Sequence, residues 1–152
     1  LLFFGCRRED KDYLFISEWK ELGFVPIQPD RPHSLSKSIN GVRFDIELAF
    51  SRTPDCSRVY ATDRIRERGA DVSAMIYTGG HVFVAGSANK MPSDVRKSII
   101  QVLVEHPPSP FPSPSPVVVD KEERDIGKLE AEAEAILAGM TRTKAYYVEA
   151  WS

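Results

Sequence analysis

Short apolar runs alternate along the chain with segments of helical periodicity. Residues 1–6 (Leu-Leu-Phe-Phe-Gly-Cys) and 82–86 (Val-Phe-Val-Ala-Gly) are almost continuously apolar, and each contains a glycine at or near its end. Residues 44–50 alternate apolar and polar side chains and then become wholly apolar. Such runs are typical of strands buried in a parallel sheet. We predict strands in these three segments and in residues 145–152, which have a strand-like composition.

Between the strands, apolar residues recur at helical spacing. Gly69 is a weak point in the helical segment of residues 65–76, because glycine lowers helix stability. Pro92 and Asp94 suit the first turn of the segment of residues 91–103, where proline loses no hydrogen bond and a carboxylate meets the positive end of the helix dipole. Gly139 suits a helix end. The helices that we predict cover residues 13–22, 65–76, 91–103 and 121–137.

This order of elements predicts an α/β fold, a doubly wound parallel sheet with helices on both faces and ligands at the carboxyl ends of the strands. Two segments interrupt it. Residues 24–40 contain three prolines and several serines, so we expect a surface excursion without regular structure. Residues 106–119 include six of the 11 prolines, and we expect a Pro/Ser-rich surface linker. No part of the sequence is independent of the rest, so residues 1–152 read as one domain.

Composition narrows the function classes. The 152 residues carry 20 basic and 22 acidic side chains, a net charge of −2, which gives no general attraction to nucleic acid or to an anionic membrane. No apolar run approaches the length of a membrane span. Cys6 and Cys56 cannot build a disulfide framework, which fits a reducing, cytoplasmic location. His33, His81 and His106 are scattered, so we predict no metal site. Hydrolase and P-loop motifs do not occur.

One candidate for chemistry follows the strand at residues 44–50. Ser51-Arg52 lies at its carboxyl end, and Arg58-Val59-Tyr60 follows a few residues later. Two guanidinium groups, a hydroxyl and an aromatic ring are what a 2′-phosphorylated adenosine needs: bidentate bonds to the phosphate and a surface for the adenine. Exposed arginines are common in turns, however, and this motif alone favours two solvated arginines.

Two further places have an ordinary and a functional interpretation. Residues 85–92 form a small-residue loop between a strand and a helix, either a tight turn or a place where backbone donors meet a nicotinamide or a phosphate. Trp151 stands one residue before the carboxyl end of the sequence. Its side chain either fills a space in the core or offers a flat surface on which a planar cofactor stacks.

Taken together and in order, these motifs resemble the NADP-binding subdomain of the diflavin reductases, which join a ferredoxin-NADP reductase-like module to a flavodoxin-like domain. The resemblance spans essentially the whole chain. The motifs that carry it are Leu2-Phe3-Phe4-Gly5-Cys6-Arg7, Asp12-Tyr13, Ala49-Phe50-Ser51-Arg52, Arg58-Val59-Tyr60, the loop of residues 86–91 and Trp151-Ser152.

The resemblance implies roles for these residues. Ser51, Arg52 and Arg58 would bind the 2′-phosphate of NADPH, and Tyr60 would stack on the adenine. One residue more than usual separates Ser51 from Tyr60, and Arg58 stands where lysine is usual, but we expect the preference for NADPH to persist. The resemblance assigns further cofactor contacts to Val59, Ala61, Thr62 and Asp94.

At the other end of the nucleotide, Trp151 would cover the flavin and swing away for hydride transfer. Ser87 and Glu149 stand where microsomal members carry aspartates, and with Trp151 they are the catalytic candidates. Ala85 and the Met91-Pro92 pair resemble the soluble cytosolic branch, whose members pass electrons to an anamorsin-type protein in cytosolic iron-sulfur cluster assembly. The function implied is hydride transfer from NADPH to FAD, and then electron transfer through FMN to a protein acceptor.

Residues 1–6 read as a central strand, which needs neighbours on both sides, so we expect the sequence to be part of a longer protein. The family's first strand and pyrophosphate turn, and its FAD- and FMN-binding domains, would precede Leu1. We therefore expect residues 1–152 to be a partial NADP(H)-binding subdomain that holds no flavin alone. The alternative is a truncated, non-catalytic module that binds nucleotide or docks on a partner.

Overall fold

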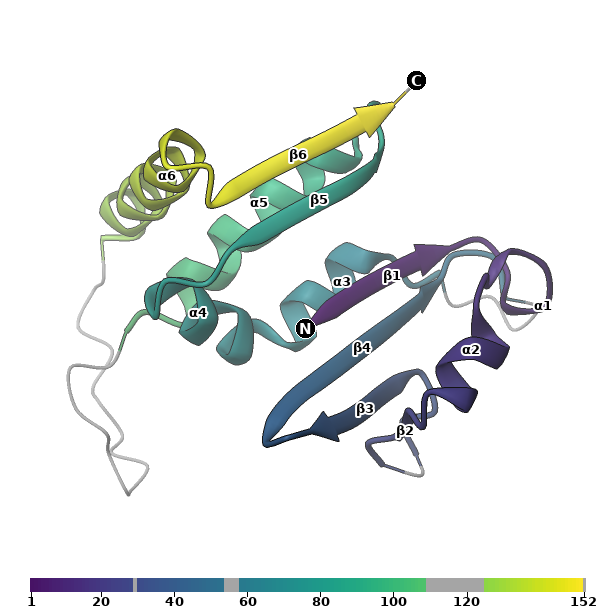
Figure 1. Cartoon of the computed structure of the whole chain (residues 1–152). Helices are drawn as coiled ribbons and strands as arrows, with labels where there is room; N and C mark the ends of the chain where they lie inside the picture. Colours follow the sequence, from purple (N-terminus) through teal and green to yellow (C-terminus); the bar gives the residue numbers. More distant parts are fainter. Residues whose placement is uncertain (29, 54–57, 109–124, 152) are drawn as a thin grey trace. The chain divides into compact units, whose positions relative to one another are not determined.

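The computed structural model describes residues 1–28, 30–53, 58–108 and 125–151, which form two compact units (Figure 1). The first unit comprises Leu1–Arg64 and the second Ile65–Ser152. Each unit contains a pair of parallel strands together with helices. The α/β class with parallel strands is therefore confirmed, although antiparallel strands extend the sheet of the first unit.

The sheet of the first unit has the strand order β1-β4-β3-β2. Strands β1 and β4 run parallel, with Leu2 opposite Ile46 and Cys6 opposite Phe50. This register places the carboxyl ends of the two strands side by side. The strands are β1 (Leu2–Cys6), β2 (Val25–Pro26), β3 (Ser34–Ile39) and β4 (Val42–Phe50).

Strands β2 and β3 occupy the segment in which we expected no regular structure, so that prediction was wrong. Strand β3 pairs antiparallel with β4, and a tight turn at Asn40 and Gly41 joins them. Both turn residues have positive φ, 51° and 80°, as the two central residues of a hairpin turn require. Pro32 precedes β3, where it removes no hydrogen bond from the β3 ladder.

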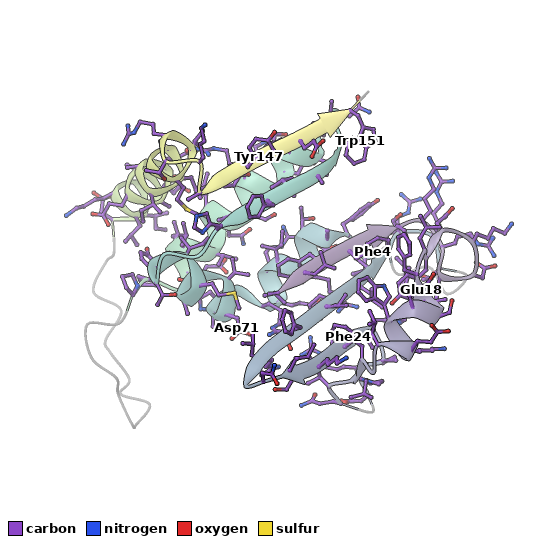
Figure 2. All side chains as sticks on the ribbon, in the orientation of Figure 1. Phe4, Glu18, Phe24, Asp71, Tyr147 and Trp151 are labelled. Carbon is purple, nitrogen blue, oxygen red and sulfur yellow. The ribbon has the colours of Figure 1, made fainter. Side chains whose placement is uncertain are left out.

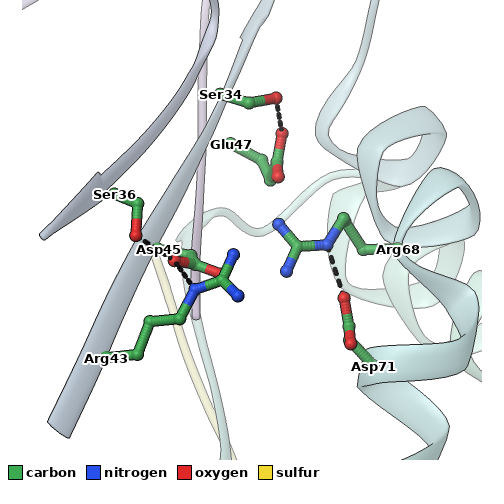
Figure 3. A network of polar contacts seen from close by, with 7 residues as sticks. All are labelled: Ser34, Ser36, Arg43, Asp45, Glu47, Arg68 and Asp71. Atoms are coloured by element: carbon green, nitrogen blue, oxygen red, sulfur yellow. Dashed lines mark hydrogen bonds and ion pairs between the residues drawn. The ribbon is translucent and has the colours of Figure 1, made fainter. Parts of the chain in front are cut away.

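The serines of β3 pair with carboxylates of β4 on one face of the sheet (Figure 3). Ser34 donates to Glu47, and the Ser36 hydroxyl donates to Asp45 Oδ1 at 2.7 Å. Arg43 Nε donates to the same Asp45 oxygen at 2.7 Å. These cross-strand bonds give polar residues a place in the sheet, which explains why a serine-rich segment forms a strand.

The opposite face of this sheet carries the apolar core of the first unit. Two short helices, α1 (Glu9–Asp12) and α2 (Ile16–Glu21), follow β1, and α2 contributes Ile16 and Trp19 to this core. We predicted one helix over residues 13–22, but the observed helix begins at Ile16 because Phe15 has a positive φ of 67°. Side chains of this core include Phe4, Phe24 (Figure 2), Tyr13, Ile16, Trp19, Leu35, Ile46, Leu48 and Phe50.

Tyr13 packs between the two parallel strands in this core. Its ring centroid lies 5.8 Å from that of Phe4 and 5.7 Å from that of Phe50. The buried hydroxyl finds no hydrogen-bond partner among the described residues. Burial, and then the charge of Glu9, raise the pKa of Tyr13. Tyr13 thus stays neutral and holds the ends of β1 and β4 by packing.

The helical segment that follows β4 is divided as its glycine predicted. Helix α3 (Ala61–Glu67) ends before Arg68, and helix α4 (Gly69–Tyr77) begins at Gly69. In the first unit, Arg64 of α3 donates from Nε to the carbonyl of Leu48 at 2.9 Å. This bond ties the start of α3 to β4.

In the second unit, β5 (Val82–Ser87) and β6 (Tyr146–Trp151) pair in parallel. Helix α5 (Met91–Glu105) packs on β5, and α6 (Ile126–Arg142) packs on α5 and β6. Val84 and Tyr146 are buried, whereas Phe83 and Tyr147 on the other face are 73% and 52% exposed. Tyr147 is labelled in Figure 2. The two-stranded sheet therefore buries one face and presents aromatic rings on the other.

The two expected boundaries of the last helix had different outcomes. Residues 121–124 lie outside the described residues, as do residues 109–119 of the predicted linker. The prediction that the helix ends at Gly139 was wrong, because α6 continues to Arg142. The Thr143 N–H donates to the Gly139 carbonyl at 3.1 Å, and the positive φ, 59°, belongs to Lys144. No helix among the described residues is long and apolar enough to cross a membrane.

The position of Gly139 gives a direct test of this helix end. Gly139 lies inside α6 without a positive φ, and a side chain there meets only the end of Arg142 at 3.8 Å. We expect Gly139→Ala to raise the free energy of unfolding by about 0.5 to 1 kcal/mol, since alanine is the better helix former. Denaturant unfolding measures it.

A matched control is Gly79, which follows α4 with a φ of 88°. An alanine is strained in that conformation, so Gly79→Ala should lower the free energy of unfolding by about 1 kcal/mol. A comparable loss in Gly139→Ala would show that Gly139, and not Lys144, ends the helix in the left-handed conformation.

Candidate functional site

The ends of β1 and β4 place three polar residues together in the first unit. The Ser51 N–H donates to the Cys6 carbonyl at 3.1 Å, and the Arg52 N–H donates to the Arg7 carbonyl at 2.8 Å. Because the hydrogen bonding continues past the last strand residues, Arg7 and Arg52 leave the sheet as neighbours. Two arginines that are 45 positions apart in the sequence thereby reach one place.

A third segment joins them through the last residue of β4. The Val59 N–H donates to the Phe50 carbonyl at 3.1 Å, which fixes the stretch from Arg58 to Tyr60 beside the strand end. Arg58 is exposed, and the Tyr60 side chain is 50% exposed. Helix α3 starts at the next residue, Ala61.

These segments surround an open depression of about 410 Å³. Its lining includes three guanidinium groups, the serine hydroxyl and one aromatic ring. The arginines are exposed, as the ordinary interpretation expected, but they gather around one place. The lining residues are Arg7, Ser51, Arg52, Arg58 and Tyr60.

One arginine near this depression is already paired with a carboxylate. Arg8, the neighbour of Arg7, makes a bidentate pair with Asp10, with an Nε to Oδ1 distance of 2.8 Å and an ion pair of 2.6 Å. Burial, and then the Asp12 charge, raise the pKa of the Cys6 thiol. The arginines and the serine that gather around the depression suit the binding of an anion.

Sequence reasoning missed one lining residue, and three of its predicted cofactor contacts lie beside the depression without being among its lining residues. Arg7 appeared only as part of a motif, although its place directly after β1 could have revealed it once β1 was paired with β4. Val59 contributes a backbone bond, and Ala61 and Thr62 open α3. These three are not among the residues that line the depression. The extra residue expected between Ser51 and Tyr60 lies in a stretch of which residues 54–57 are outside the described residues.

The second unit brings the catalytic candidates together at the carboxyl ends of β5 and β6. Ser87 lies opposite Trp151, and Ala85 lies opposite Glu149. Side chains two positions apart share a face of a strand, so Ser87, Glu149 and Trp151 project from the same face of this sheet. The Ala88 N–H donates to the Trp151 carbonyl at 2.8 Å, and the Trp151 ring is 58% exposed.

The loop between β5 and α5 is shaped by a glycine. Gly86 has a φ of 153°, and a side chain there would lie 2.6 Å from Met91 Cε. The Asn89 amide donates to the Ser87 hydroxyl at 3.0 Å across the turn. Asp94 is exposed in the first turn of α5. It belongs to the second unit and is not among the residues that line the depression of the first.

No family model matches the chain, but it is similar to two curated proteins. The chain is 31% identical over 106 residues to an NADPH–cytochrome P450 reductase from Candida maltosa, a match that covers 70% of the chain and 14% of that protein. It is 34% identical over 105 residues to the sulfite reductase [NADPH] flavoprotein alpha-component of Pectobacterium atrosepticum, covering 69% and 15%.

Both relatives are NADPH-dependent flavoprotein oxidoreductases, the class that the sequence motifs resemble. The chain is homologous to the diflavin oxidoreductases, to which both relatives belong. It spans about one seventh of the length of these relatives, 14% and 15%. The resemblance inferred from the motifs is thus confirmed at the level of the family, and the cytosolic branch stays a prediction.

The loop at Gly86 can be tested by stability. We expect Gly86→Ala to lower the free energy of unfolding by about 1 to 2 kcal/mol, because its positive φ disfavours a side chain and the added methyl meets Met91. The measurement is denaturant unfolding.

A double variant separates the two causes of this loss. Met91→Ala removes the contact but leaves the backbone conformation, so Gly86→Ala should still be destabilising in a Met91→Ala background. Full recovery there would mean that crowding, and not φ, makes glycine necessary.

Proposed function

We propose that the chain binds NADPH and that the depression of the first unit holds its 2′-phosphate. The observation that carries this proposal is the convergence of Arg7, Arg52 and Arg58 with Ser51 around one open site. Guanidinium forks and a hydroxyl are matched to the oxygens of a phosphomonoester. Tyr60, half exposed in the same lining, stacks on the adenine.

We propose that the second unit serves the reacting end of the nucleotide. NADPH, when bound, supplies the hydride that reduces a flavin. Trp151 offers its exposed ring to the FAD, Ser87 and Glu149 flank the nicotinamide on the same sheet face, and Asp94 contacts the nucleotide from α5. The residues of this chain bind, orient and cover, and the cofactors carry the electrons.

In this proposal the chain is the NADPH-binding part of a diflavin reductase. Hydride passes to FAD, and electrons pass through FMN to a protein acceptor. The FAD- and FMN-binding domains and the acceptor, an anamorsin-type protein of cytoplasmic iron-sulfur cluster assembly, are its partners. Support for this branch comes from Ala85 and the Met91-Pro92 pair in the loop after β5.

The alternative is a non-catalytic module that binds nucleotide or docks on a partner, and the size of the native protein distinguishes the two. An antibody against residues 121–152 should detect a band several times heavier than 17.1 kDa if the chain is part of a diflavin reductase. A band at 17.1 kDa would instead support the module.

Arg52 provides the first test of the phosphate site. The chain should bind 2′,5′-ADP more tightly than 5′-ADP, and Arg52→Ala should weaken 2′,5′-ADP by roughly 10-fold or more with little effect on 5′-ADP, because a charge-assisted hydrogen bond contributes about 1.5 to 3 kcal/mol. Titration calorimetry at constant salt measures both ligands.

Arg8→Ala is the matched control for that variant. Arg8 is paired with Asp10 and is not among the lining residues, so both affinities should stay close to those of the unaltered chain. Equal affinity of the unaltered chain for the two ligands would refute the assigned 2′-phosphate site.

A second test concerns electron transfer. We expect the purified 152-residue chain to show no flavin absorbance and to leave NADPH unoxidised, because the flavins are held elsewhere in the proposed reductase. The absorbance of the reduced nicotinamide is the measurement. Consumption of NADPH by the chain with no added flavoprotein would contradict the proposal that other domains hold the flavins.

A further inference from the structure

The first turn of α3 contains a carboxylate that holds the backbone of Tyr60. The Tyr60 N–H donates to Asp63 Oδ2 at 2.7 Å, and the Asp63 N–H donates back to the Tyr60 carbonyl at 3.0 Å. A side chain that accepts from the residue three positions earlier closes the start of a helix reciprocally. The hydrogen bonds of Asp63 therefore help to fix the residue at which α3 begins.

This bond is one of two hydrogen bonds that hold the backbone at Val59 and Tyr60. The preceding residue, Val59, is bonded to the Phe50 carbonyl at the end of β4. Side-chain direction depends on backbone conformation, so the direction of a half-exposed ring depends on both hydrogen bonds. The ring lines the depression, whereas Asp63 is not among its lining residues.

We propose that Asp63 is a positioning residue, which orients Tyr60 as the platform for the adenine of a 2′-phosphorylated nucleotide. The inference rests on the proposed function, in which Tyr60 stacks on the adenine. The carboxylate also has an opposing effect, because its negative charge lies close to a site that attracts phosphate. What binding requires is thus the acceptor oxygen of Asp63 and not its charge.

Two variants separate the acceptor from the charge. Asp63→Asn keeps an oxygen that can accept the Tyr60 N–H, and Asp63→Ala keeps none. By titration calorimetry, Asp63→Ala should weaken 2′,5′-ADP by roughly 5- to 10-fold, the lower end of the range of a lost base stack. It should leave the affinity for ribose 2-phosphate, which carries the 2-phosphate but no adenine, within about two-fold. Asp63→Asn should bind 2′,5′-ADP as tightly as the unaltered chain or more tightly.

Asp71 provides a matched control, because it also lies in the first turn of a helix and accepts from Arg68 Nε at 2.7 Å. Asp71→Ala should leave the affinity for 2′,5′-ADP unchanged. Amide hydrogen exchange gives a readout without nucleotide: the Tyr60 amide should exchange faster in Asp63→Ala and stay protected in Asp63→Asn.

Three results would overturn the inference. These are unchanged affinity for 2′,5′-ADP in Asp63→Ala, an equal loss for ribose 2-phosphate, and unchanged exchange of the Tyr60 amide. The first two require that the unaltered chain binds 2′,5′-ADP and so leave the proposed function standing. If the unaltered chain does not bind 2′,5′-ADP at all, the proposed function fails first, and the adenine role of Asp63 fails with it.

Discussion

The parallel pairing of β1 with β4 is the constraint on which the candidate site depends. Its register places Cys6 opposite Phe50, and the backbone bonds beyond those two residues carry the pairing into the loops. A slip of one residue would turn every side chain of a strand to the opposite face, and the arginine after β1 would leave the site. The core beneath, in which Tyr13 packs on Phe4 and Phe50, holds this register.

The two units contribute different chemistry. The first gathers three arginines around an open depression, an arrangement that suits an anion. The second presents aromatic and small polar side chains on one face of a two-stranded sheet. Among the described residues, no group of histidine, cysteine or carboxylate side chains could hold a metal ion.

Sequence patterns were reliable for strands with an apolar or an alternating run of residues. Such runs located strands β1, β4, β5 and β6. Strand β3 was missed because its serines satisfy cross-strand carboxylates, a pairing that is visible only after folding. The Asn40-Gly41 turn was the local signal that could have revealed it. Gly139 misled the prediction because a helix can contain glycine as well as end at it.

The candidate site was partly predictable for a related reason. Ser51, Arg52, Arg58 and Tyr60 lie close together in the sequence, so a motif could gather them. Arg7 reaches the same depression only through strand pairing, which no local pattern encodes. Asp63 was overlooked because its contribution is a bond to the Tyr60 backbone.

The hairpin turn at Asn40 and Gly41 has a practical consequence for work on this protein. Strand β4 separates the turn from Ser51, and nine residues of strand span about 30 Å. The turn is exposed, and exposed loop tips tolerate added residues well. A fluorophore or an affinity handle attached there would report on the first unit, or immobilise it, while leaving the depression at the other end of β4 open to solvent.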